Sequence, residues 1–423
     1  MVESNIECTI EAVWRMESAK IIAKLARMLR DVGLAEELAQ DALVTALEQW
    51  PKSGVPSNPG AWLMVTAKNR ALDQLRRFKL LQRKHQIVAQ EAELFATETP
   101  PPDEVPDDDI EDDLLRLIFT ACHPVLSTEA RLALTLRLLG GLTTAEIARA
   151  FLVTEPTIAQ RIVRAKRALS EAHVPFEMPR ADELAARLTS VLEVIYLIFN
   201  EGYAATAGAE WMRPTLCEEA LRLGRILAEL APKEPEVHGL IGLMEIQASR
   251  AGARVGPFGE PILLLEQDRA RWDWLLIRRG LAALERAEGL GGALGPYALQ
   301  AAVAACHARS RTAGETDWTR IVALYDALAQ LAPSPVVDLN RAVAVSMAFG
   351  PVAALEIVDA LIRDSRLGSY HLLPSVRGDL LEKLGRFEEA RIEFARAAAL
   401  AQNTRERTLL LGRAAASGTL AQH

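Results

Sequence analysis

The sequence is poor in aromatic residues and in strand-forming patterns, and these shortages limit the folds that it can adopt. Aromatic side chains make up 5% of the 423 residues although half of the chain is hydrophobic, so the apolar residues are mostly Ala and Leu. Runs of alternating Val, Ile, Thr or Tyr, which would indicate strands, are almost absent. The sequence therefore predicts an all-α fold, and its length favours several compact units.

Cysteine is also sparse, and its spacing excludes two kinds of site. Cys8, Cys122, Cys217 and Cys306 lie far apart with no CxxC pair, which excludes a disulfide framework and a zinc finger and indicates a reducing compartment. Cys122 and Cys306 are each followed by His, which gives neither metal-ligand spacing nor a nucleophile with its base. We therefore expect no metal, no cofactor and no enzymatic activity.

Five polar residues of the second half leave two interpretations open. They either line a polar groove or form buried ion pairs and interdomain contacts, and they are Glu201, Tyr203, Asp268, Arg271 and Asp273.

The sequence has no segment typical of a membrane protein. The first residues are polar and carry no apolar signal-peptide run. The one long stretch without Lys, Arg, Asp or Glu, residues 289–308, is rich in Gly and Ala and would span a bilayer poorly. We therefore expect a cytoplasmic protein with no membrane partner.

Charge is distributed unevenly along the chain. The formal net charge of -8 would argue against nucleic-acid binding, but residues 61–90 carry seven basic side chains against one acid. Residues 91–113 carry eleven acids, no base and four prolines, which predicts a linker that cannot fold by itself. A second boundary is expected at residues 173–180, where two prolines interrupt a helical pattern.

The basic segment predicts a helix with one face suited to nucleic acid. Asn58 is expected to cap this helix, with Pro59 at its first position. An aromatic ring can stack on an unpaired base, Asn can read a base edge, and Arg can neutralise phosphates. Asp73 is spaced to hold Arg76 and Arg77 in place. A merely solvated basic face is the alternative for this stripe, which contains Trp62, Thr66, Asn69, Arg70, Asp73, Arg76 and Arg77.

Residues 142–169 show the pattern of a helix-turn-helix. Thr143 or Thr144 is expected to cap a short first helix, with Glu146 in its first turn, and Pro156 opens a longer one. The buried face of this second helix would contain Ile158, Ile162, Ala165 and Leu169. Its exposed face has Gln and Arg, which read adenine and guanine edges in the major groove. The exposed residues are Thr157, Gln160, Arg161, Arg164 and Arg167.

A weak repeat of helix, glycine turn and Ala-rich helix occurs near the end of the chain. Its copies are residues 336–361, with Gly350, and residues 371–400, with Gly385. In the second copy Gly378, Ala390, Phe394 and Ala397 have the spacing of a tetratricopeptide unit. An unrelated helical hairpin is the alternative.

Residues 10–172 as a whole resemble the sigma factors of the extracytoplasmic-function type. The sequence AEELAQDALVTALEQW at residues 35–50 is similar to region 2.2, NPGAWLMVTAKNRALDQLRR at 58–77 to regions 2.3 and 2.4, and residues 132–169 to region 4. The resemblance implies a region 2 domain at residues 1–90, the acidic linker at 91–113 and a region 4 helix-turn-helix domain at 114–175. Its partners would be core RNA polymerase, through the β′ clamp helices and the β flap, and promoter DNA.

The same resemblance assigns roles to individual residues. Residues 51–59 would hold an unstacked base of the -10 element. Ala159 and Gln160 stand where the family often has an Arg-Ser pair, so the preferred -35 sequence cannot be transferred. Core polymerase would be bound by Glu36, Glu37, Gln40 and Asp41, the -10 element by Trp62, Thr66, Asn69, Arg70, Arg76 and Arg77, and the -35 element by Thr157, Gln160, Arg161, Arg164 and Arg167.

The second half resembles the long extension of one subgroup of these sigma factors. FNEGY at residues 199–203 and LLLEQDRARWDW at 263–274 are among the segments that carry the likeness. It implies a helical extension at residues 180–290 and tetratricopeptide-like repeats at 291–423. The fused second half would regulate the sigma part, and its repeats would offer a site for a protein partner. The acidic linker would mimic nascent RNA in the polymerase or serve only as a tether. The main alternative function is a helix-turn-helix regulator that senses a ligand or peptide through its repeats.

Overall fold

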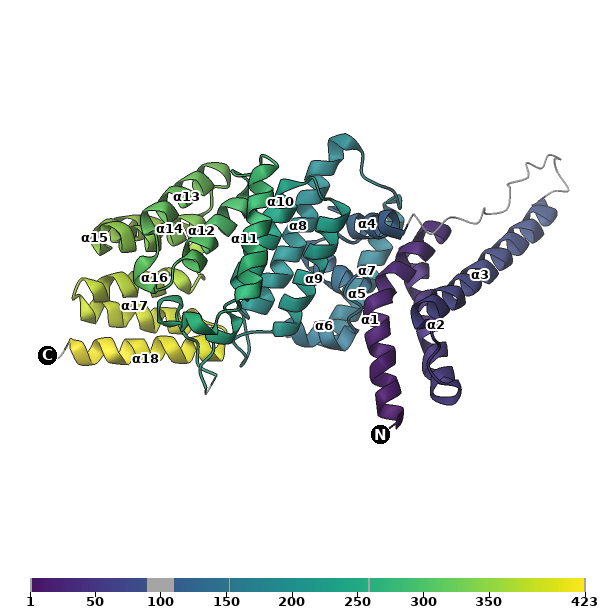
Figure 1. Ribbon diagram of the computed structural model, residues 1–423, viewed down its shortest axis with the longest axis horizontal. Coiled ribbons are helices and arrows are strands. Elements are labelled where there is room, and N and C mark those ends of the chain that lie inside the picture. Colours follow the sequence, from purple (N-terminus) through teal and green to yellow (C-terminus); the bar gives the residue numbers. More distant parts are fainter. Residues whose placement is uncertain (1, 90–109, 152, 258, 422–423) are drawn as a thin grey trace. The chain divides into compact units, whose positions relative to one another are not determined.

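The computed structural model describes residues 2–89, 110–151, 153–257 and 259–421 and is helical throughout (Figure 1). Within these ranges it has 18 α-helices, a few short 3-10 turns and no strand, which confirms the all-α prediction. None of the described helices is long and apolar enough to cross a membrane. The acidic linker predicted at 91–113 lies mostly outside the described residues.

The chain divides into two compact units, Met1–Val194 and Ile195–His423. The loop expected near residues 173–180 separates α7 from α8, but the division between the units falls inside α8 (Ala181–Tyr203). The first half of α8 packs on unit 1, where Arg187 donates to the carbonyl of Phe119 at 2.7 Å and Ser190 to that of Cys122 at 2.8 Å. Unit 1 therefore includes the beginning of the segment predicted as an extension.

The first part of unit 1 contains α1 (Val2–Leu29), α2 (Val32–Ser53) and α3 (Pro59–Ala89). Asp31 caps α2 by accepting from the amide of Leu34. Asn58 accepts from the amide of Ala61 at 3.1 Å and so caps α3, as the sequence predicts. The buried face of α3 consists of Leu63, Ala67 and Ala71, which pack against α1 and α2.

The second part of unit 1 contains α4 (Ile110–Ala121), α5 (Thr128–Leu138), α6 (Thr144–Phe151) and α7 (Glu155–Glu171). Helix α4 begins before the expected end of the linker, so Asp112 and Asp113 are helical. Asp113 is buried and pairs with Arg116 at 2.6 Å, a contact that brings this acidic residue into the fold. Burial raises the pKa of Asp113, while Arg27 and Arg116 oppose this shift.

Unit 2 is a succession of helices in which each packs on its neighbours. Close approach depends on small residues: a Cβ added at Gly242 would lie 3.0 Å from the carbonyl oxygen of Gly280, and one at Gly239 would lie 2.7 Å from the amide of Ala298. After the end of α8 the helices are α9 (Pro214–Leu230), α10 (Pro235–Ala248), α11 (Trp274–Gly289), α12 (Pro296–Arg309), α13 (Trp318–Leu331), α14 (Pro335–Phe349), α15 (Pro351–Leu361), α16 (Leu372–Lys383), α17 (Phe387–Leu400) and α18 (Thr404–Leu420).

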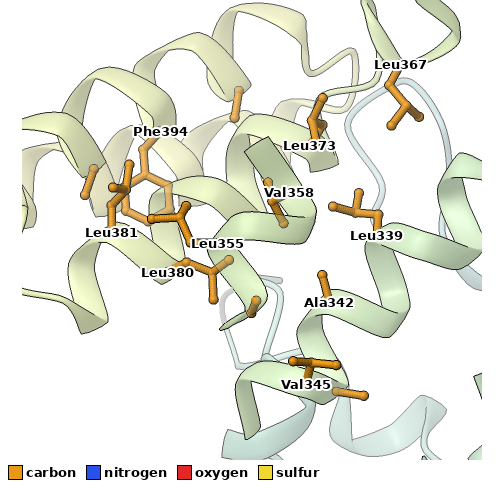
Figure 2. Close-up of a cluster of buried hydrophobic side chains, with 14 of the residues drawn as sticks. Leu339, Ala342, Val345, Leu355, Val358, Leu367, Leu373, Leu380, Leu381 and Phe394 are labelled. Atoms are coloured by element: carbon orange, nitrogen blue, oxygen red, sulfur yellow. The ribbon is translucent and has the colours of Figure 1, made fainter. Parts of the chain in front are cut away.

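The predicted repeat corresponds to two helix pairs, α14 with α15 and α16 with α17. Gly350 and Gly385 lie between the paired helices with φ angles of 98° and 73°, a conformation that favours glycine. Figure 2 shows Leu339 of α14, Leu355 and Val358 of α15 and Phe394 of α17 in one apolar cluster. The glycine turns are thus confirmed, whereas the tetratricopeptide assignment stays a prediction.

Gly378 in α16 tests whether close packing stabilises unit 2. An added Cβ there would lie 2.9 Å from ring atoms of Phe394, which is completely buried. We expect Gly378→Ala to destabilise the protein by about 1 to 3 kcal/mol. Gly412→Ala in α18, where a Cβ meets nothing within 4 Å, should leave stability unchanged or increase it. Thermal unfolding of the full chain measures both, and equal midpoints for the two variants would contradict this account.

Candidate nucleic-acid interface

The first candidate surface is the polar face of α3. Asn69, Arg76 and Arg77 are exposed, and Trp62, Thr66 and Arg70 are half-buried. Asp73 and Arg76 form the expected ion pair at 3.2 Å. On the side of α3 away from the buried Leu63, Ala67 and Ala71, the polar residues open to solvent therefore include Asn69, Asp73, Arg76 and Arg77.

Trp62 is held in place by a second tryptophan that the sequence analysis did not single out. Its ring meets that of the buried Trp50 edge to face, with centroids 5.4 Å apart. An aromatic residue at the end of one helix and another at the start of the next was the signal available in the sequence. The contact restricts the orientation of the half-buried Trp62 indole.

Arg70 joins two sets of residues that the sequence assigns to different partners. It forms an ion pair with Asp41 of α2 at 3.1 Å and donates to Thr45 Oγ1 at 2.7 Å. Asp41 was predicted to contact polymerase and Arg70 to contact DNA. In the structure they contact each other, so α2 positions one guanidinium of the α3 stripe.

The loop between α2 and α3 is shorter than expected. Helix α2 continues to Ser53, which leaves residues 54–58 of the predicted base-holding loop 51–59, and most of these are exposed. Gly54 has a φ of 84° and its amide donates to the carbonyl of Trp50, so the loop turns sharply away from α2.

The second candidate surface is the helix-turn-helix of α6 and α7. Thr143 caps α6: the amide of Glu146 donates to its Oγ1 at 3.1 Å, and its own amide donates to Glu146 Oε2 at 2.8 Å. This reciprocal box agrees with the prediction. Burial raises the pKa of Glu146, but the hydrogen bonds from Thr143 and the charge of Arg15 outweigh it and lower the pKa.

Helix α7 buries the face that the sequence predicts, with Ile158, Ile162, Ala165 and Leu169 inside. Gln160, Arg164 and Arg167 are exposed, and Thr157 and Arg161 are half-buried. Arg167 forms an ion pair with Glu171 at 2.6 Å. Gln160 and Arg164 are one helical turn apart and exposed, a geometry that allows both to enter a groove together.

Helix α2 presents the residues predicted to bind polymerase unequally. Glu37 is exposed and Gln40 and Asp41 are half-buried, but Glu36 is only 3% exposed. Glu36 Oε1 accepts from Arg137 Nε of α5 at 2.7 Å, and its Oε2 pairs with Lys166 of α7. In this conformation Glu36 contacts the helix-turn-helix part of unit 1 and is not available to a partner.

Two further charged contacts join the same two parts of unit 1. Arg15 of α1 pairs with Glu146 of α6 at 2.7 Å, and Arg27 of α1 lies 3.5 Å from Asp113 of α4. Both candidate surfaces therefore belong to one compact body whose halves are joined by ion pairs and by the packing of α1 on α4.

The structure offers little for catalysis or metal binding. No group of three or more His, Cys, Asp or Glu that could hold a metal occurs among the residues placed by the structure. Burial raises the pKa of Cys122 to about 11 and that of Cys217 to about 12. Of the five polar residues left open above, Glu201 pairs with Arg213, and Asp268 and Asp273 cap helices.

Comparison with known proteins identifies three segments. Residues 14–79 match the family "Sigma-70 region 2", residues 116–169 match "Sigma-70, region 4", and residues 187–288 match a family of unknown function, DUF6596. The chain is 44% identical over 384 residues to the uncharacterized protein R00370 of Rhizobium meliloti (strain 1021). The aligned residues make up 90% of this chain and 89% of that relative.

The two sigma matches include both candidate surfaces and also α2, which precedes them in the chain. The region 2 match counts against a helix-turn-helix regulator that acts on duplex DNA alone, since such a protein needs no region 2. Sigma domains also imply core RNA polymerase and promoter DNA as partners. The chain therefore belongs to the RNA polymerase sigma factors of the extracytoplasmic-function type, carries a helical C-terminal extension, and serves in transcription initiation.

Proposed function

We propose that α3 opens and reads the -10 element and that α7 reads the -35 element. The observation that carries this proposal is the exposure of Asn69, Arg76 and Arg77 on α3 and of Gln160 and Arg164 on α7, each opposite a buried apolar face. The protein acts by binding and not by catalysis. Helix α2 docks on the β′ clamp helices, and the region 4 part docks on the β flap.

Run-off transcription on a promoter library, with purified core polymerase, tests the assignment. We expect specific transcripts only when the protein and core enzyme are both present. Duplex promoter DNA should bind poorly without polymerase, because a -10 element is read as an open strand. Tight duplex binding without polymerase, together with no transcript at any salt concentration, would refute it.

Arg164 tests the -35 assignment. We expect Arg164→Ala to weaken recognition by about 1 to 3 kcal/mol on promoters with the preferred -35 sequence and less on others. Val163→Ala, also exposed on α7, is the matched control and should leave promoter preference unchanged. Promoter competition assays measure both. An equal loss on every sequence would identify Arg164 as a phosphate contact.

We call the conformation in which Glu36 contacts Arg137 and Lys166 the closed form of unit 1. Because Glu36 is buried in it, we infer that the closed form competes with polymerase binding. Docking of α2 through Glu36 requires its contacts with Arg137 and Lys166 to break. Arg137 and Lys166 are partly exposed, and the buried Glu36 becomes hydrated when the two parts separate, so water replaces these contacts at modest cost. We infer that unit 1 opens when polymerase binds.

Lys166→Ala tests this competition without altering α2. Loss of one of the two cations beside Glu36 weakens the closed form by about 1 kcal/mol, which should raise affinity for core polymerase by at most roughly fivefold. Arg149→Ala, an exposed charge on α6, is the control and should leave affinity unchanged. Binding is measured with core enzyme and no DNA. Unchanged affinity of Lys166→Ala would show that the closed form does not compete.

We further propose that the extension regulates the sigma part and that its repeats dock a protein partner. The support is α8, whose first half packs on unit 1 while its second half belongs to unit 2. Arg131 of α5 contacts this first half, donating to Ser190 and pairing with Glu193 at 3.2 Å.

Two deletions separate regulation from structural support. Removal of residues 180–423 strips the first half of α8 from unit 1, exposing the carbonyls that Arg187 and Ser190 satisfy, and should lower transcription and stability together. Removal of residues 195–423 keeps these contacts and should lower transcription while unit 1 remains folded. Transcription assays and circular dichroism measure the two effects. Full activity after the shorter deletion would exclude a regulatory role.

A further inference from the structure

Unit 2 contains three buried arginines around the turn that follows α10. Arg250, Arg254 and Arg269 are 8%, 6% and 8% exposed. Among the residues that the structure describes, none of the three lies within ion-pairing distance of a carboxylate. Burial of an unpaired charge costs several kcal/mol. The buried Glu245 nearby shows the usual solution, because Arg225 and Arg279 lie within 2.9 and 3.3 Å of it.

Arg269 has a structural role. It donates to the carbonyls of His307 and Ser310 at 2.5 and 2.7 Å and to Thr316 Oγ1 at 3.3 Å, so it ties η4 (Arg269–Arg271) to the end of α12. Arg250 and Arg254 differ, because Arg250 Nε and Arg254 Nη1 are buried without a hydrogen-bond partner in the described structure.

Arg250 and Arg254 lie on the same aromatic residue. Their guanidinium carbons are 5.7 and 3.4 Å from the ring centroid of Tyr203, the last residue of α8. Cation–π contact stabilises each charge in part but does not neutralise it. Burial lowers the pKa of Arg254, and Arg250 adds to this effect by repulsion. Two like charges are thus held close together in the interior.

The surrounding aromatic residues add hydrogen-bond donors. Trp211 lies 5.6 Å from the guanidinium of Arg254, and Trp272 lies 6.0 Å from that of Arg250. Both indole Nε1 atoms are buried and unpartnered in the same way as the arginine nitrogens. Arg and Trp side chains can only donate. The cluster therefore has four hydrogen-bond donors without acceptors and two positive charges without a negative one, among the described residues.

A hollow of about 470 Å³ lies beside this cluster, and Trp211 forms part of its wall. Its other lining residues include Arg405, one carboxylate, Glu210, and Ala251 and Val255, the chain neighbours of the two arginines, which do not line the hollow themselves. Its size is within the range of small-molecule sites. The rim is fixed by the fully buried Asn403, whose Nδ2 donates to the carbonyls of Ala205 and Glu210.

We propose that Arg250 and Arg254, with Tyr203 and Trp211, bind the phosphate or carboxylate group of a small anionic molecule that enters through this hollow. The ligand supplies the acceptor oxygens and the negative charge that the donor-only side chains of Arg250, Arg254 and Trp211 lack, while the ring of Tyr203 holds the two guanidiniums. This site goes beyond the proposed promoter and polymerase contacts, and its binding does not depend on them.

Thermal unfolding and calorimetric titration of the full chain, with inorganic phosphate and with citrate at matched ionic strength, test the proposal. We expect a saturable rise of the unfolding midpoint with at least one of them. Saturation by phosphate alone assigns a phosphate group, and saturation by citrate alone assigns a carboxylate. No saturable response, or the same response to chloride, means an adventitious ion only and overturns the site.

Variants distinguish a ligand site from a structural cluster. Arg250→Met removes an unpaired buried charge, so it should raise the midpoint of the ligand-free protein and abolish the anion response. Arg269→Met, equally buried but bonded to carbonyls, is the matched control and should lower the midpoint. A lower midpoint for Arg250→Met, or an anion response that survives in it, would overturn the proposal.

Trp211→Phe is a second test that keeps a ring in the wall and removes one donor. We expect anion affinity to fall roughly tenfold with an unchanged circular dichroism spectrum. Unchanged affinity would exclude Trp211 from the site as proposed. None of these measurements involves polymerase or DNA, so their failure is distinguishable from failure of the proposed promoter contacts.

Discussion

Close approach of helices through Ala and Gly is the constraint on which the rest of the structure depends. With few aromatic residues the core cannot be filled by large rings, so helices come within contact of each other's backbones, as at Gly242 and Gly280. Interfaces this close have no room for long polar side chains. The arginines after α10 and the caps of α3 and α6 lie at helix ends, where polar side chains have room.

Local features of the fold and of both candidate DNA-binding faces could be predicted from the sequence. The caps at Asn58 and Thr143, the buried face of α7 and the glycine turns depend on residues within a turn or two of one another. Glu36 illustrates what could not be predicted. Its partners Arg137 and Lys166 are 101 and 130 residues away, and their contact follows from how two modules pack. Arg250 and Arg254 were missed because a lone arginine in a sequence indicates a surface position.

Buried charge is paired at Glu36 of unit 1 but lacks an opposite charge at Arg250 and Arg254 of unit 2, among the residues that the structure describes. Glu36 is buried with two cations, an arrangement that adds little stability but fixes which residues meet. Arg250 and Arg254 are buried with no anion beside them in the described structure, which stores unfavourable energy in the fold. The first arrangement favours a reversible contact between modules, and the second favours capture of a charged molecule.

Helix α8 connects the two units in sequence and also affects the order in which they fold during synthesis. The helix-turn-helix of α6 and α7 ends at Glu171, but the carbonyls of Phe119 in α4 and of Cys122 just after it accept hydrogen bonds from Arg187 and Ser190 of α8. During synthesis the chain folds from its N-terminus as it leaves the ribosome. The region 4 part therefore reaches its final packing only after the start of α8 has emerged, so production of the extension has begun before the sigma part is finished.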